Sequence, residues 1–292
     1  MPDSTPSPPP AVYRLLREPP NLAVESAILA GLPDLSPVEQ EAALDTLVAR
    51  GRDRRLVELL SAFERWGPEL QKRILARGDH LYAAARLGVA DEAQETRLAV
   101  IEFIRRTGDC KLAYLLADGL RHLCPKTRER AARALTELTA AYLSRYPTGT
   151  GPTAAVGETR TDGDYLARAL ARAVRTWELH FRPEVLRAAM WMAERIADVF
   201  FEEVAEPRSK LARAVGKVLT ASDDGRLAGF AVRALLCPTL RSEVARTIEA
   251  SSHPAFARGL MAESWLLADR SIAKAWRRIH RLAWLDEGTV CL

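Results

Sequence analysis

The chain has 292 residues, and its 42 basic and 38 acidic residues leave a formal net charge of +4 at pH 7. This length exceeds a typical globular core of roughly 100 to 200 residues, so we expect two domains or one array of repeats. No apolar run approaches the roughly 20 residues that a membrane span needs, which predicts a soluble protein without a membrane partner. The mild charge does not indicate nucleic acid binding by itself, and most of the cations are Arg, as a coding sequence rich in G and C produces.

The first ten residues, MPDSTPSPPP, lack both the basic and the apolar region of a secretory signal. Their prolines favour an extended arm, so residues 1–10 are expected to form a disordered, Pro-rich leader. Four cysteines lie far apart in the sequence, at Cys110, Cys124, Cys237 and Cys291. Without a Cys-x-x-Cys pair they indicate small buried side chains in a reducing compartment, so we expect a cytoplasmic protein.

Helical signals recur along the chain, and strand signals are nearly absent. Ser36-Pro37-Val38-Glu39 is a capping box with Pro at the first helical position, and Gly51 should end the helix that follows. Further helix boundaries are expected at Trp66-Gly67-Pro68, Gly108-Asp109 and Cys124-Pro125. Helices joined by such short turns must pack antiparallel to their neighbours, so the pattern predicts an all-α protein built of helical hairpins.

One segment interrupts this rhythm. Residues 147–163 are rich in Gly, Pro and Thr and have no apolar periodicity, which predicts a flexible loop. The loop would separate an N-terminal helical block, residues 11–146, from a C-terminal block, residues 164–292, that continues the array. The helix expected from Pro183 to Val204 is longer and more aromatic than the others, so the C-terminal block is expected to be less regular.

Residues Glu95–Leu138 carry a pattern of small and aliphatic residues at helical spacing. Its first helix has Arg97, Ala99, Ile101 and Ile104, its turn is Gly108-Asp109, and its second helix has Leu112, Leu115, Leu116 and Leu120, after which Arg128, Ala131, Ala132, Ala134 and Leu135 restart the cycle. The segment resembles HEAT repeats of the bacterial HEAT-like class. The resemblance implies an α-solenoid of about seven stacked antiparallel hairpins that recognises a partner and does not imply a particular reaction.

The residue types that carry chemistry do not form a recognisable site. Five histidines are dispersed, Gly149-Thr150-Gly151 lacks the strand and the Lys of a phosphate-binding loop, and no Gly-x-Ser-x-Gly elbow occurs. We therefore predict no catalytic residue, no cofactor and no metal, which favours a non-enzymatic role.

The last expected helix, residues 270–285, has a basic stripe. On a helical wheel one side holds five cations, Arg270, Lys274, Arg277, Arg278 and Arg281. Trp284 lies on the flank of this stripe, where its indole could support a stacked base or a guanidinium. The stripe is either the polar cap that a repeat array needs or a surface for an anionic partner. A shorter stripe, Arg168, Arg172 and Arg175, has the same two interpretations.

The helix expected over residues 183–204 places Trp191 in the middle of a charged arc with Glu184, Arg195, Asp198 and Glu202. A Trp in that position is either covered by the 147–163 loop or an adjacent helix, or exposed as an anchor for a partner. In the second case Asp198, two turns away, would accept a hydrogen bond from the partner.

Three functions remain open. The favoured hypothesis is a scaffold or interaction protein that binds a protein partner on the solenoid surface. The alternative is a nucleic-acid-binding HEAT-like protein, including the DNA glycosylase type, because Trp191, Asp198 and the arginine stripes share residue types with such enzymes. A lyase or maturation factor acting on a cofactor-bearing partner is the third.

Overall fold

A computed structural model describes residues 22–51, 53–146, 158–205, 209–221, 224–250, 253–263, 266, 268–277 and 279. Over these ranges every regular element is a helix, with 17 α-helices and several short 3-10 helices and no strand. The all-α prediction is therefore confirmed. None of the helices in the described ranges has both the length and the apolar character needed to cross a bilayer.

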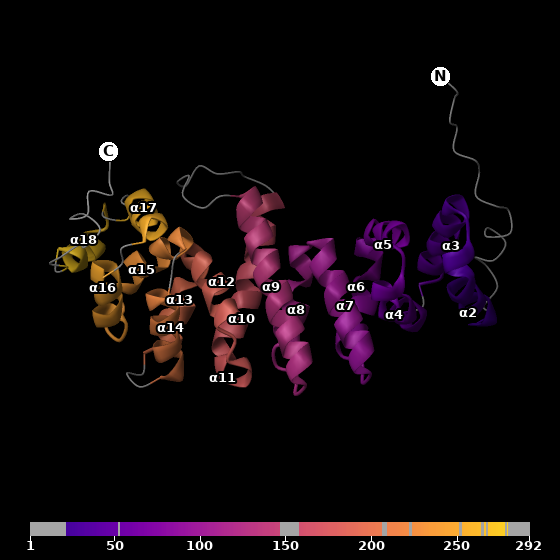
Figure 1. Ribbon diagram of the computed structural model, residues 1–292, viewed down its shortest axis with the longest axis horizontal. Coiled ribbons are helices and arrows are strands. Elements are labelled where there is room, and N and C mark those ends of the chain that lie inside the picture. The colour runs from indigo at the N-terminus through magenta and orange to yellow at the C-terminus, as the bar shows by residue number, and fades with distance from the viewer. Residues whose placement is uncertain are drawn as a thin grey trace, which may run out of the picture. The chain divides into compact units, whose positions relative to one another are not determined.

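The chain divides into two compact units, Met1–Leu115 and Leu116–Leu292, and the division falls within helix α8, Ala113–Gly119. Unit 1 contains six further helices, α2 (Leu22–Gly31), α3 (Pro37–Arg50), α4 (Asp53–Ser61), α5 (Pro68–Leu75), α6 (Tyr82–Val89) and α7 (Gln94–Thr107), labelled in Figure 1. Helices α4, α6 and α7 pack against one another. Their contacts form the core of this unit, with Phe63 and Phe103 in edge-to-face contact.

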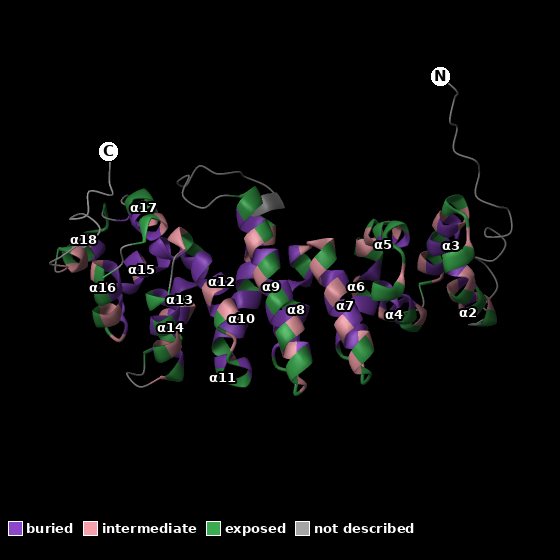
Figure 2. Ribbon diagram, viewed as in Figure 1, coloured by how far each residue is buried: buried purple, intermediate pink, exposed green. Residues whose placement is uncertain are grey.

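Unit 2 contains ten helices in the described residues, α9 (Pro125–Arg145), α10 (Glu158–Arg175), α11 (Trp177–His180), α12 (Pro183–Trp191), α13 (Ala193–Glu203), α14 (Lys210–Thr220), α15 (Ala228–Ala234), α16 (Arg241–Ala250), α17 (Pro254–Ala262) and α18 (Arg270–Trp276). Two series of neighbours run through the unit. Helix α12 contacts α9 and α14, and α14 contacts α16; helix α13 contacts α10 and α15, and α15 contacts α17. The long helices α9 and α10 carry both buried and exposed residues along their length (Figure 2).

The helix ends follow the predicted capping signals. Helix α3 has the capping box of Ser36 and Glu39 and ends at Gly51, which adopts the left-handed conformation with φ of 60°. Gly108 ends α7 with φ of 65°. A residue without a Cβ adopts this conformation at low cost, so glycine determines where both helices stop.

Two other expectations differ from the structure. Helix α10 begins at Glu158, so residues 158–163 are helical although the sequence analysis assigns them to the loop. Gly163 lies inside this helix, and its lack of a Cβ lets the Tyr142 hydroxyl of α9 approach closely. The helix expected from Pro183 to Val204 is two helices that meet at Met192, although neither Gly nor a further Pro marks the break.

One arginine device recurs in both units. Arg97, Arg128 and Arg241 each lie in the first turn of a helix and donate to the backbone carbonyls six and five residues earlier. For Arg128 the two distances are 2.9 Å to His122 and 2.9 Å to Leu123. Each guanidinium satisfies carbonyl groups of the turn that enters the helix, so each of these three turns is stabilised by its own residues.

An aspartate device recurs as well. Asp109, Asp224 and Asp269 each accept a hydrogen bond from the backbone N–H two residues later, at 2.8, 3.0 and 2.7 Å. The residue three positions after each Asp is buried, and these are Leu112, Leu227 and Ile272. The turn therefore starts a helix and directs an aliphatic side chain into the core, which explains why Asp-x-x-Leu/Ile-Ala occurs at all three places.

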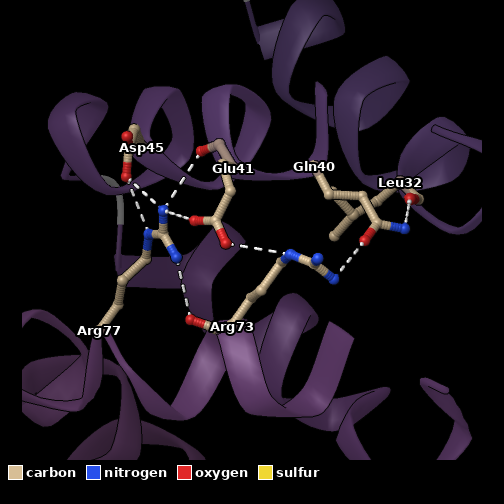
Figure 3. A network of polar contacts seen from close by, with 6 residues as sticks. All are labelled: Leu32, Gln40, Glu41, Asp45, Arg73 and Arg77. Atoms are coloured by element: carbon tan, nitrogen blue, oxygen red, sulfur yellow. Dashed lines mark hydrogen bonds and ion pairs between the residues drawn. The ribbon is translucent and has the colours of Figure 1, made fainter. Parts of the chain in front are cut away.

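In unit 1 a polar network joins α3 to α5 (Figure 3). Arg77 binds Asp45 at 2.6 Å and also pairs with Glu41, which in turn binds Arg73 at 3.0 Å. Burial lowers the pKa of Arg77, but its hydrogen bonds to Glu41 and Asp45 outweigh burial and raise it above its usual value. Gln40 completes the network by donating to the Leu32 carbonyl and accepting from Arg73.

Candidate functional site

Unit 2 has two hollows that contain predicted binding residues. We call the first the Trp191 cleft. It has a volume of about 590 Å³ and is lined by Thr136, Pro183, Glu184, Arg187, Trp191, Asp224 and Arg226. Its walls come from α9, from α12 and from the turn at Gly225–Leu227, which contacts α12.

Trp191 is buried, with 8% of its surface exposed, because Asp224 and Arg226 cover it. The indole Nε1–H donates to Asp224 Oδ2 at 2.8 Å, and the Arg226 guanidinium carbon lies 3.8 Å from the centre of the indole ring. Arg226 also donates from Nε and Nη2 to the two oxygens of Asp224, at 3.1 Å each. One carboxylate therefore holds both the ring and the cation that stacks on it.

The charge of Asp224 is stabilised by these contacts. Partial burial raises the pKa of its carboxyl. The hydrogen bonds from the side chain and backbone of Arg226, the positive charge of Arg226 and the hydrogen bond from Trp191 together lower the pKa by more than burial raises it. The net effect is a pKa below the ordinary value of 3.8. The carboxylate consequently remains ionised at neutral pH and keeps Arg226 in place over the indole.

We call the second hollow the Asp198 groove. It has a volume of about 410 Å³, and its residues come from α13, α15, α18 and the segment before α18. The apolar part of its lining is Ala193, Ala197, Phe201, Leu236, Leu266, Ala268 and Ile272, and the charged part is Glu194, Arg195, Asp198, Arg233 and Asp269.

Among the residues that the structure describes, one carboxylate in the lining of the Asp198 groove has no partner. Arg195 pairs with Asp164 at 2.5 Å, and Arg233 lies 3.9 Å from Glu194. Asp269 caps α18 through the backbone N–H groups of Ser271 and Ile272. Asp198 is exposed and makes no hydrogen bond or ion pair with any residue that the structure describes.

The structure separates two residues that the sequence analysis combined. Trp191 and Asp198 lie on different helices and line different hollows, so Asp198 does not stand beside a Trp191 anchor. The reason is the break at Met192, which the uninterrupted helical wheel did not include. Of the two interpretations of Trp191 the structure supports the covered one, with Arg226 over the ring.

The basic stripe of the last helix is described only in part. Arg270, Lys274 and Arg277 are exposed and pair with no acidic residue in the described ranges, while Ile272 on the other side of α18 is buried. Arg278, Arg281 and Trp284 lie outside the described residues.

The shorter stripe on α10 is largely neutralised by acidic neighbours. Arg172 pairs with Asp118 at 2.6 Å, and Arg175 lies 3.9 Å from Glu202 and 3.8 Å from Glu203. Arg168 alone of the three is exposed without a described acidic partner. The interpretation as an ordinary solvated helix face therefore fits α10.

Comparison of the sequence with protein-family models and with curated proteins gives no match. Within the described residues no three His, Cys, Asp or Glu side chains gather in a way that could hold a metal ion.

Sequence reasoning missed Arg187, Asp224 and Arg226, which make the Trp191 cleft polar. A signal for two of them was available. Asp224-Gly225-Arg226-Leu227-Ala228 has the same pattern as Asp109-Cys110-Lys111-Leu112-Ala113 in the segment that resembles HEAT repeats. Aligning these turns would have placed Asp224 at the start of a helix, although it would not have shown that Trp191 lies beside it.

Proposed function

We propose that the chain is a HEAT-like α-solenoid of about seven hairpins that binds a macromolecular partner and catalyses no reaction. The recurring turn devices support the repeat interpretation, because Arg97, Arg128 and Arg241 make the same contacts at the same spacing in both units. The two series of helix neighbours in unit 2 also fit stacked hairpins.

The partner in this proposal is a protein, and the Asp198 groove is its binding surface. The observation that carries the proposal is the apolar lining around Leu236 and Phe201 beside the carboxylate of Asp198, which has no partner among the described residues. Such a groove suits a peptide segment with an aliphatic or aromatic side chain for the apolar lining and a Lys or Arg for Asp198. Leu236 is 37% exposed, so part of its surface is available to the partner.

Selection of peptides from a random display library against the whole chain tests this proposal. We expect the selected peptides to pair an apolar residue with a basic one and to bind Asp198→Asn about tenfold more weakly than the parent chain. Glu129→Gln is the matched control, because it removes one exposed carboxylate from α9 outside the groove. Equal binding to the parent chain, Asp198→Asn and Glu129→Gln would reject the groove as the site.

Nucleic acid binding is the second candidate, and one observation favours it. Arg270, Lys274 and Arg277 expose three cations on α18 without an acidic partner in the described part of the chain. A titration with a DNA duplex over a range of salt concentrations tests this candidate. Replacing all three residues with Gln should lower the dependence of the binding constant on salt concentration by the equivalent of about three phosphate contacts. Absence of binding at low salt would reject nucleic acid binding.

A further inference from the structure

The Trp191 cleft has no lining residue in common with the Asp198 groove. Its volume of about 590 Å³ falls in the range of roughly 300 to 1,000 Å³ that is usual for small-molecule sites. Two guanidinium groups, those of Arg187 and Arg226, line the cleft together with the hydroxyl-bearing side chain of Thr136.

Arg226 is held in a fixed orientation. Its plane is set by stacking on Trp191 and by two hydrogen bonds to Asp224. These bonds occupy two of the five N–H groups that a guanidinium carries, so three remain for a ligand. Because Trp191 and Asp224 already restrict the Arg226 side chain, this side chain would lose little further conformational entropy when a ligand binds.

Arg187 supplies the second cation. It lies on α12, one turn before Trp191, and is only partly exposed. It makes no hydrogen bond or ion pair with any residue in the described ranges, and the nearby Glu184 lies 3.9 Å from Arg182. A partly buried guanidinium without an acceptor is thus directed at the same cleft as Arg226.

We propose that the Trp191 cleft binds the oxyanion of a small ligand, a carboxylate or a phosphate group, with Arg187 and Arg226 as the hydrogen-bond donors. The planar fork of a guanidinium matches both kinds of oxyanion in a bidentate manner. Asp224 holds the Nε and Nη2 groups of Arg226, so the ligand would bind the remaining N–H groups, on Nη1 and on the second position of Nη2. Thr136 donates only a long hydrogen bond of 3.4 Å, to the Glu184 carbonyl, and its hydroxyl can turn to the ligand.

Titration of the whole chain with sodium phosphate and, separately, with sodium acetate tests the proposal, with sodium chloride keeping the ionic strength constant. The readout is the indole N–H resonance of Trp191 in a nitrogen-15 correlation spectrum, assigned by its loss in Trp191→Phe. This proton lies in the hydrogen bond to Asp224, so a ligand on Arg226 should shift it in a saturable manner. The anion that saturates distinguishes a phosphate ligand from a carboxylate ligand.

Three variants provide the comparison. Arg187→Gln should weaken saturable binding about tenfold or more, whereas Arg187→Lys, which keeps the charge and loses the fork, should weaken it less. Arg213→Gln is the matched control, because it removes an exposed Arg of α14 that has no ion pair within the described ranges and does not line the cleft. The proposal is overturned if neither anion shifts the Trp191 resonance beyond the chloride control, or if Arg187→Gln binds as tightly as Arg213→Gln. A native-like indole spectrum of Arg187→Gln establishes that this variant is folded.

Discussion

Trp191 donates its indole N–H to the carboxylate of Asp224 across 2.8 Å, although the two residues are 33 positions apart in the chain. This hydrogen bond links the end of α12 to the turn before α15, and Arg226 covers the ring from the same turn. The two segments are also neighbours in the fold, since α12 packs beside the turn at Gly225–Leu227. The contact therefore acts as a polar clasp between α12 and the turn before α15 in unit 2.

Replacing Trp191 with Phe removes the donor and leaves the Asp224 oxygen with one partner fewer. We expect the free energy of unfolding to fall by about 1 to 2 kcal/mol, since a partly buried acceptor is left less satisfied and the stacking with Arg226 weakens. Urea denaturation measures the change. Leu123→Ala, at a side chain that is 91% exposed, should change stability little. A loss no larger than that of Leu123→Ala would contradict a stabilising role for the clasp.

The clasp also predicts a pH dependence. The pKa of Asp224 is lower in the folded chain than its ordinary value of 3.8, so the ionised carboxylate stabilises the fold. The stabilisation is complete above the unfolded pKa and is lost as the pH falls through the lower, folded pKa. The stability difference between the parent chain and Asp224→Asn should thus be constant from about pH 7 to about pH 5 and shrink towards about pH 3. Urea denaturation of both chains at each pH gives this difference, and a difference that grows at low pH would contradict the assignment.

The arginine device at helix entrances can be tested in both units. Arg97→Met and Arg128→Met each remove a guanidinium that satisfies two backbone carbonyls, and each should cost about 1 to 3 kcal/mol of stability. The equivalent change at Arg168, which is exposed and has no acidic partner among the described residues, should be close to neutral. Chemical denaturation of the three variants provides the comparison. Similar losses for Arg168→Met and Arg97→Met would show that the device adds nothing to stability.

Gly163→Ala tests whether the helical start of α10 depends on a close approach. The added Cβ would collide with the Tyr142 hydroxyl and come within 2.9 Å of the Arg195 guanidinium carbon. Both are the ends of side chains that can shift, so we expect a loss of only about 1 kcal/mol. At Gly31, the last residue of α2, nothing lies within 4 Å of an added Cβ, so Gly31→Ala is the matched control and should not lower stability. Thermal unfolding of both variants distinguishes them, and equal melting temperatures would argue against tight packing at Gly163.

Local signals in the sequence were sufficient for the helix ends, because Ser36, Gly51 and Gly108 act through bonds to residues at most a few positions away. The predicted start of α10 was wrong because it depends on a contact with a distant part of the sequence. The role of Gly163 depends on Tyr142, which belongs to another helix and is not near it in the local sequence pattern. From the sequence alone, a glycine that permits close packing of two helices cannot be distinguished from a glycine in a loop.

The candidate sites were predicted less well than the fold. A helical wheel placed Trp191 within a charged arc, but it assumed one continuous helix to Val204, and most of that arc lies on α13 beyond the break. The break at Met192 has no Gly or Pro to announce it, so the separation of Trp191 from Asp198 could not be seen. The partners Asp224 and Arg226 are brought to Trp191 only by tertiary packing.

The arginine device at Arg97, Arg128 and Arg241 has a consequence for how such a chain can evolve. Each guanidinium binds carbonyls within six residues of itself. The residues that stabilise each of these three turns therefore lie in one short segment of the sequence. Duplication of a segment that contains one of these turns would copy the arginine together with the carbonyls that it binds. Chains of different length with the same local turns are the expected products of such a history.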